Sequence, residues 1–221
     1  HQDIGALIDS TWERLSESEQ VAFMKMSAFR GGCTREAAEN VTGADLHTLI
    51  SLVNKALLKR DMENGRFNIH ELLRQYAEKQ LQNSHLVETV QRDHFEYYVG
   101  NLIDFFPQLM SADIVKTADA IEQDWENYVV AWYYGVKNYQ IEQIRGMTIT
   151  LYLFWDTHSH NEWAQMISEA CIKFEPDYSD HSCFVMILYI YTVLIFHGEP
   201  VREITLLERA AKLANKHSML W

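Results

Sequence analysis

The chain has 221 residues, 48% of them hydrophobic, which is enough for two packed domains of about 100 residues each. Its formal charge of −12 is divided unevenly: residues 1–85 hold 10 Lys and Arg against 12 Asp and Glu (−2), and residues 86–221 hold 9 against 19 (−10). The second half therefore repels polyanions, which argues against nucleic-acid binding by that half.

Cysteine usage argues against two further classes of protein. The three cysteines, Cys33, Cys171 and Cys183, are far apart and form no CxxC pair, so neither a disulfide framework nor a zinc finger is expected. The chain begins at His1 without a basic, apolar leader. We therefore expect a segment of a longer, cytoplasmic protein.

The first elements expected are two helices joined by a short turn. Thr34 is a good N-cap for a short helix that Gly43 would end, and Asp45 is an acceptable N-cap for the next one. The apolar face of the first helix holds Ala37, Ala38 and Val41, and that of the second holds Leu46, Leu49, Ile50, Val53 and Leu57. Joined by residues 42–44, the two form a helix-turn-helix pair.

A β-hairpin is expected next. Residues 57–60 and 66–69 flank the turn segment 61–65, in which Asn64-Gly65 supplies the positive φ that a hairpin needs. This hairpin would be the wing of a winged helix. Helical spacing resumes directly afterwards at Leu72, Leu73, Tyr76 and Ala77.

The second half predicts a succession of helices. Steps of four and three place Ile114, Ala118, Ile121, Trp125, Tyr128 and Trp132 on one long amphipathic face. Further helical spacing covers residues 141–155, 163–170 and 204–211. Pro107, Pro176 and Pro200 are expected between the helices, because proline ends them.

A weak internal repeat and one apolar run lie near the end of the chain. A shift of 41 positions aligns residues 162–172 with 203–213, which predicts two stacked helical hairpins at about 141–174 and 183–216, or else a chance match of two amphipathic helices. The run from Cys183 to Phe196 has 14 residues, fewer than the roughly 20 that a membrane span needs. We expect a buried helix there and no membrane association.

The order of these motifs resembles a known family. GG-T-EAA, a leucine-spaced helix ending in L-V-x-K-x-L-L, a wing and then IHELLRQYAEKQL are similar to the winged-helix domain of STAND signal-transduction ATPases. These include bacterial regulators with tetratricopeptide-like (TPR-like) repeats and the NB-ARC proteins of plant immunity and animal apoptosis. STWERLSESEQVAFMKMSAF is similar to the entry into that domain, and DWENYVVAWYYGVKN and LYLFWDTHSHNEWAQMISEA resemble the first repeat helices, so the likeness covers about residues 5–174.

The resemblance implies a mainly α fold in two parts. A winged helix-turn-helix domain with a small β-hairpin wing would occupy residues 1–85, and an α-helical TPR-like sensor region would occupy residues 86–221. The winged helix would act as a nucleotide-dependent lid on an upstream NTPase domain, and the helical region would bind a ligand or a partner protein. Such a protein is a two-state regulator biased from two sites.

The resemblance also implies one site residue. Ile69-His70-Glu71 stands where NB-ARC proteins have Met-His-Asp, whose histidine contacts the β-phosphate of ADP, so His70 is the candidate nucleotide contact. His70 could instead simply begin the closing helix and satisfy a backbone group. We expect ADP or ATP in the parent protein, no cofactor in this chain, and a His70 that faces solvent.

The residues predict no catalytic site. None of the nine glycines begins a GxxxxGK[ST] or GxGxxG pattern, and there is no HExxH or GxSxG. His158, His160 and Glu162 could be considered metal ligands, but alternate histidines at a helix junction diverge, so a polar turn is the better interpretation. Cys33 has no identifiable base beside it. The chain is expected to be neither an enzyme nor a metal site.

Two other functions remain open. In one, the winged helix binds DNA: the helix residues facing the major groove would be Thr48, Ser51, Asn54 and Lys55, and the wing residues on phosphates would be Lys59, Arg60 and Arg66. The low local positive charge disfavours it. In the other, the helical region is a protein-binding scaffold. Its groove could be lined by Trp125, Trp132, Tyr133, Trp155 and Trp163, although such aromatics are more often core.

Overall fold

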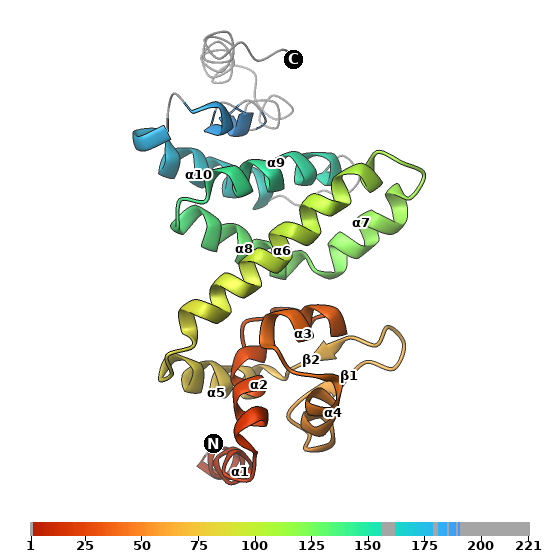
Figure 1. Ribbon diagram of the computed structural model, residues 1–221, viewed down its shortest axis with the longest axis vertical. Helices are drawn as coiled ribbons and strands as arrows, with labels where there is room; N and C mark the ends of the chain where they lie inside the picture. Colours follow the sequence, from red (N-terminus) through yellow and green to blue (C-terminus); the bar gives the residue numbers. More distant parts are fainter. Residues whose placement is uncertain (1, 156–161, 179–180, 185, 189, 191–221) are drawn as a thin grey trace. The chain divides into compact units, whose positions relative to one another are not determined.

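The computed structural model describes residues 2–155, 162–178, 181–184, 186–188 and 190. Over these residues the protein is mainly helical, with one small antiparallel sheet of two strands (Figure 1). The chain divides into two compact units, which we call the first unit (residues 1–98 with 123–130) and the second unit (residues 99–122 with 131–221).

The first unit is built around a central helix. Its elements are α1 (Gln2–Trp12), α2 (Glu17–Met26), α3 (Arg35–Thr42), α4 (Leu46–Asn54), β1 (Lys59–Arg60), β2 (Phe67–Asn68), α5 (Glu71–Gln82) and the first half of α6 (Val87–Leu109). Helix α2 packs against α3, α4 and α5. A capping box starts α2: the Ser16 side chain accepts from the Glu19 amide, and the Glu19 carboxylate accepts from the Ser16 amide.

The caps predicted for α3 and α4 are confirmed. Thr34 Oγ1 accepts from the Ala37 amide at 3.1 Å, and Asp45 Oδ1 accepts from the Thr48 amide at 2.8 Å. Gly43 ends α3 with a φ of 72°. Each of these bonds joins residues only a few positions apart, so the local sequence is enough to predict it.

Helix α4 ends earlier than its apolar spacing predicts. Its last residue is Asn54, and Ala56 then adopts a left-handed φ of 57°. The amides of Leu57 and Leu58 both donate to the Leu52 carbonyl, at 3.0 and 3.3 Å. Leu57 is buried as the spacing requires, but it reaches the core from this turn, so placing it within the helix is wrong.

The two strands form the hairpin expected between residues 57 and 69, although each strand is shorter than predicted. Lys59 pairs with Asn68 and Arg60 with Phe67. Gly65 has a φ of 72°, which confirms the turn signal of Asn64-Gly65. Phe67 also exchanges two backbone hydrogen bonds of 2.9 Å with Cys33, so the loop before α3 pairs with β2.

The second unit contains the rest of α6, α7 (Ile114–Gln123), α8 (Trp125–Lys137), α9 (Ile141–Trp155) and α10 (Glu162–Tyr178), apart from residues 123–130. The rings of Trp132 and Trp163 meet edge to face at 4.9 Å, and Trp132 Nε1 donates to the Met166 carbonyl at 3.3 Å. Both tryptophans are almost fully buried, and Trp125 is 8% exposed. These three side chains therefore build cores and do not line a groove; Tyr133 is partly exposed, and the Trp155 side chain lies outside the described part.

Two predictions about helix ends are wrong. The single amphipathic face expected from Ile114 to Trp132 is broken at Asp124, between α7 and α8. Pro107 and Pro176 lie inside α6 and α10, close to the final residue of each, and not between helices. Each proline lacks the N–H that would bond four residues back, and each helix ends two residues after it, at Leu109 and Tyr178.

The C-terminal predictions fall mostly outside the described residues. Pro200 and most of the hairpin expected at 183–216 lie there. In the described part of the apolar run, Cys183, Phe184, Ile187, Leu188 and Ile190 are buried. No helix in the described part of the chain combines the length and apolar character needed to cross a bilayer.

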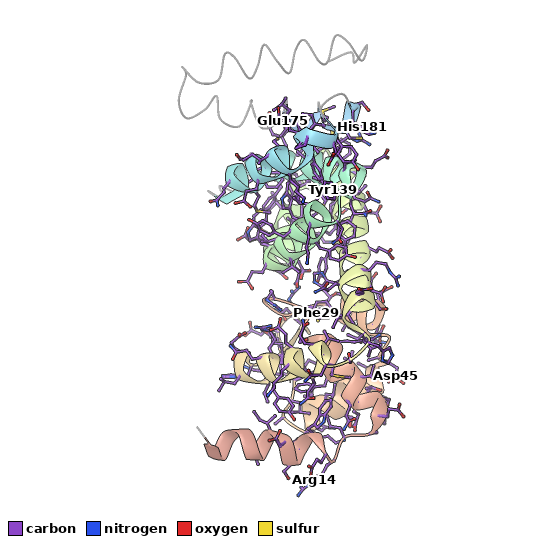
Figure 2. All side chains as sticks on the ribbon, turned by 90° about the vertical axis from the view of Figure 1, so that its left-hand side faces the viewer. Arg14, Phe29, Asp45, Tyr139, Glu175 and His181 are labelled. Atoms are coloured by element: carbon purple, nitrogen blue, oxygen red, sulfur yellow. The ribbon has the colours of Figure 1, made fainter. Side chains whose placement is uncertain are left out.

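The boundary between the units falls within α6, whereas the sequence-based division at residue 85 follows the end of α5. The first half of α6 packs on Phe29, which is 1% exposed and labelled in Figure 2. The ring of Phe29 lies 5.5 Å from that of His94 and 6.3 Å from that of Tyr98. These aromatic contacts join the first half of α6 to the rest of the first unit.

Candidate functional surface around the hairpin

His70 is exposed at the start of α5. It is the N-cap residue, with φ −65° and ψ 140°, and its Nδ1 accepts from the Leu72 amide at 3.3 Å. An Nδ1 that accepts leaves Nε2 as the protonated nitrogen of the neutral ring. The side chain can therefore cap the helix and at the same time offer a hydrogen-bond donor to a group outside the protein.

An open groove of about 370 Å³ lies beside His70. Its apolar lining consists of Val53, Ala56, Leu57, Leu58 and Leu73, and its polar lining consists of Lys59, Arg60 and His70. The turn after α4 and the start of β1 thus meet the first turn of α5 here. The groove combines an apolar floor with basic side chains on its rim.

Lys59 and Arg60 are the exposed cations of β1. Within the described residues neither forms an ion pair. The neighbouring acid Glu71 is directed elsewhere, because Arg74 donates two hydrogen bonds of 2.8 Å to it. Arg74 is the main cause that lowers the pKa of Glu71 to about 2. The rim therefore carries positive charge that is available to an anionic partner.

Two of the helix residues proposed to face DNA are engaged inside the first unit. The Ser51 hydroxyl donates to Glu19 Oε1 at 2.6 Å, and Lys55 forms an ion pair with the same oxygen. Asn54 is exposed and Thr48 is half-buried. The α4 surface that would enter a major groove therefore has part of its polar set directed toward α2.

Arg66 is not the exposed wing residue that the DNA-binding hypothesis needs. It is 7% exposed, and its guanidinium donates to the Asp124 carboxylate at 2.7 and 3.3 Å and to the Gln123 carbonyl at 3.2 Å. Its expected contact with phosphate is therefore wrong, because a buried, paired guanidinium is not presented to a ligand. Lys59 and Arg60 keep the exposure expected of them.

Sequence reasoning did not single out Asp124 and Asn127, which are the centre of a buried polar network. Asn127 Nδ2 donates to the Gly32 carbonyl at 2.9 Å and to Asp124 at 3.1 Å, and Asn127 Oδ1 accepts from the Arg30 amide at 2.8 Å. The sequence did contain a sign of this network: Asp124 interrupts an apolar helical face, and Asn127 follows three positions later.

The remaining candidates are the metal ligands and the cysteine nucleophile considered from the sequence. No cluster of His, Cys, Asp and Glu suited to a metal ion occurs among the residues that the structure describes. His158 and His160 lie outside that part of the chain, and the side chain of Glu162 is not described. Burial raises the pKa of the Cys33 thiol well above its ordinary value, so the thiolate needed for nucleophilic attack is disfavoured.

No protein-family model, curated protein or solved structure matches the chain.

Proposed function

We propose that this chain is a non-catalytic regulatory segment of a STAND-type signal-transduction ATPase. In this proposal the first unit is a winged helix that acts as a nucleotide-dependent lid on an upstream NTPase domain. The second unit is the start of a TPR-like sensor that binds a ligand or a partner protein. One observation carries the proposal: an exposed His70 caps α5 beside a groove whose rim holds Lys59 and Arg60.

The chemistry of this surface suits a diphosphate. The Nε2–H of a neutral His70 can donate one hydrogen bond to a phosphate oxygen while Nδ1 caps α5. The N-terminal end of α5 adds the positive end of a helix dipole, and Lys59 and Arg60 add positive potential at the rim. A lid held in this way loosens when the nucleotide changes.

DNA binding is the weaker candidate. Of its proposed contacts, Arg66 is buried against Asp124, and both Ser51 and Lys55 are bound to Glu19. Of the proposed cations, Lys59 and Arg60 remain exposed and without an ion pair in the described part of the chain, and two cations are too few for a surface that must neutralise several phosphates. A plain scaffold also loses three of its five expected groove residues, since Trp125, Trp132 and Trp163 are buried, whereas Tyr133 is exposed.

The test separates a nucleotide contact from a helix cap. In the protein that contains both this segment and the NTPase domain, release of a fluorescent ADP would be followed by stopped flow. His70→Ala removes the cap and the donor, whereas His70→Asn keeps a capping side chain but removes the imidazole. We expect both variants to release ADP about tenfold faster, because one hydrogen bond to a charged group is lost.

The control is His85→Ala, which removes another exposed histidine of the same unit. It should leave the release rate unchanged. If His70→Asn releases ADP at the wild-type rate and only His70→Ala is faster, His70 is a cap alone and the proposed contact is wrong.

A further inference from the structure

The break between α7 and α8 places one carboxylate inside the first unit. Asp124 is the only residue between Gln123 and Trp125, and its carbonyl accepts from the amides of Asn127 and Tyr128 at 2.9 and 3.1 Å. The Asp124 carboxylate accepts hydrogen bonds from the side chains of Arg66, Tyr98 and Asn127. It is 9% exposed and turns toward the hairpin.

The Asp124 carboxylate holds the second arm of the hairpin. Arg66, the residue before β2, donates to both of its oxygens, and the Tyr98 hydroxyl donates to Oδ1 at 3.3 Å. Arg66 and Asp124 are both almost excluded from water. A buried guanidinium that loses its carboxylate becomes an uncompensated charge, so the contact cannot be broken without moving Arg66.

Asn127 holds the same hairpin by a second route. Its amide donates to the Gly32 carbonyl and accepts from the Arg30 amide, and it is fully buried. The loop that it fixes lies tightly on β2, because a Cβ at Gly32 would approach the Phe67 carbonyl to 2.8 Å. The next residue of the loop, Cys33, exchanges two hydrogen bonds with Phe67.

We propose that residues 123–130 are a latch whose position sets whether the hairpin is ordered. Asp124 and Asn127 are the positioning residues: one binds Arg66, and the other binds the loop that pairs with β2. The chain on both sides of the latch, residues 99–122 and 131 onward, belongs to the second unit, and α8 starts in the latch and continues to Lys137. A shift of α7 or α8 therefore moves Asp124 and Asn127, and with them the contacts that hold the hairpin.

The proposal that residues 123–130 order the hairpin depends only on the contacts described above. The further role, in which the latch transmits ligand binding from the sensor to the lid, depends on the proposed function. In that use, a ligand on the second unit would shift the α7–α8 junction and release the hairpin that carries Lys59 and Arg60. The latch can be tested without nucleotide or ligand, so its failure is distinct from a failure of the proposed function.

The first experiment is hydrogen exchange followed by mass spectrometry on the whole chain with Asp124→Asn. The hairpin amides of Asp61 and Phe67 should exchange at least about tenfold faster, because their region opens locally, while α2 and α9 keep wild-type rates. Asp119→Asn makes the same chemical change at an exposed position of α7 and should alter nothing. Unchanged hairpin exchange, or equal acceleration throughout the first unit, would overturn the latch.

The reverse experiment decides the matter even if Asp124→Asn does not fold. Gly65→Val places a branched side chain at a φ of 72° and loosens the hairpin far from α8 in sequence. Because coupling is reciprocal, the amides of Asn127 and Tyr128 should then exchange several-fold faster. If they keep wild-type rates while the hairpin opens, the two elements are not coupled and the proposal is wrong.

Discussion

At the scale of single residues, Glu19 shows how one carboxylate joins three parts of the first unit. It closes the capping box of α2 with Ser16, accepts from Ser51 of α4 and pairs with Lys55 after α4. Lys55 is the main cause that lowers the pKa of Glu19 to about 2, with Ser51 and the Ser16 amide contributing. Each partner favours the ionised form.

We therefore expect the first unit to lose stability in acid through Glu19. A folded-state pKa of about 2 against an ordinary value of 4.5 means that the unfolded chain binds the proton first, so the stabilisation is complete above 4.5 and is lost as the pH falls toward 2. Thermal unfolding across this window should show a drop that is smaller in Glu19→Gln. Glu63→Gln, at the exposed hairpin turn, should retain the wild-type dependence; identical pH profiles for the wild type and Glu19→Gln would contradict the assignment.

At the scale of elements, the first unit depends on how its loop lies against the hairpin. Gly32 has a φ of 83°, and a Cβ there would lie 2.1 Å from Asn68 Oδ1 and 2.8 Å from the Phe67 carbonyl. Gly43 has a similar φ of 72°, but a Cβ there would meet nothing within 4 Å. The two glycines thus share a backbone conformation and differ in the space around them.

The pair Gly32→Ala and Gly43→Ala measures that difference. Gly43→Ala should lower the free energy of unfolding by about 1–2 kcal/mol, which is the cost of a left-handed alanine. Gly32→Ala should cost roughly 2–5 kcal/mol, because overpacking against β2 adds to the same backbone cost. Urea denaturation would measure both. Equal losses would mean that the loop can move away from β2 freely.

At the scale of the whole molecule, each unit has its own buried aromatic core. Trp132 and Trp163 anchor the second unit, and Phe23 and Phe67 are among the buried side chains of the first. Most of the negative charge lies after residue 85, but this division differs from that of the units, because Asp124 and Glu126 belong to the first unit. Separate cores allow the two units to differ in stability.

We expect truncation of one core to destabilise its own unit selectively. Trp163→Ala should cost about 3–5 kcal/mol and accelerate hydrogen exchange in α9 while α2 stays protected. Phe23→Ala should have the opposite pattern. If either variant accelerates exchange equally in both units, the protein opens as one cooperative body and the division into units has no energetic meaning.

The sequence by itself determined the features that depend on near neighbours. The caps at Thr34 and Asp45, the stop at Gly43 and the hairpin turn at Gly65 were all predictable, because each is fixed by bonds or backbone angles within a few residues. The exposure of His70 was expected from the family resemblance, and the structure places it, exposed, at the N-cap of α5. Apolar spacing also indicated helical structure over the regions of α7 to α10, although not the break at Asp124.

Only the tertiary structure decided which groups the side chains of Arg66, Asp124 and Ser51 bind. Arg66 looks like a surface cation on a turn, and Asp124 looks like a polar residue on an amphipathic helix, until they meet across 58 positions of sequence. Ser51 likewise turns to Glu19, which lies 32 positions earlier. Periodicity and propensity describe one segment at a time. A buried charge is stable only when it is paired, and its partner can lie far away in the sequence.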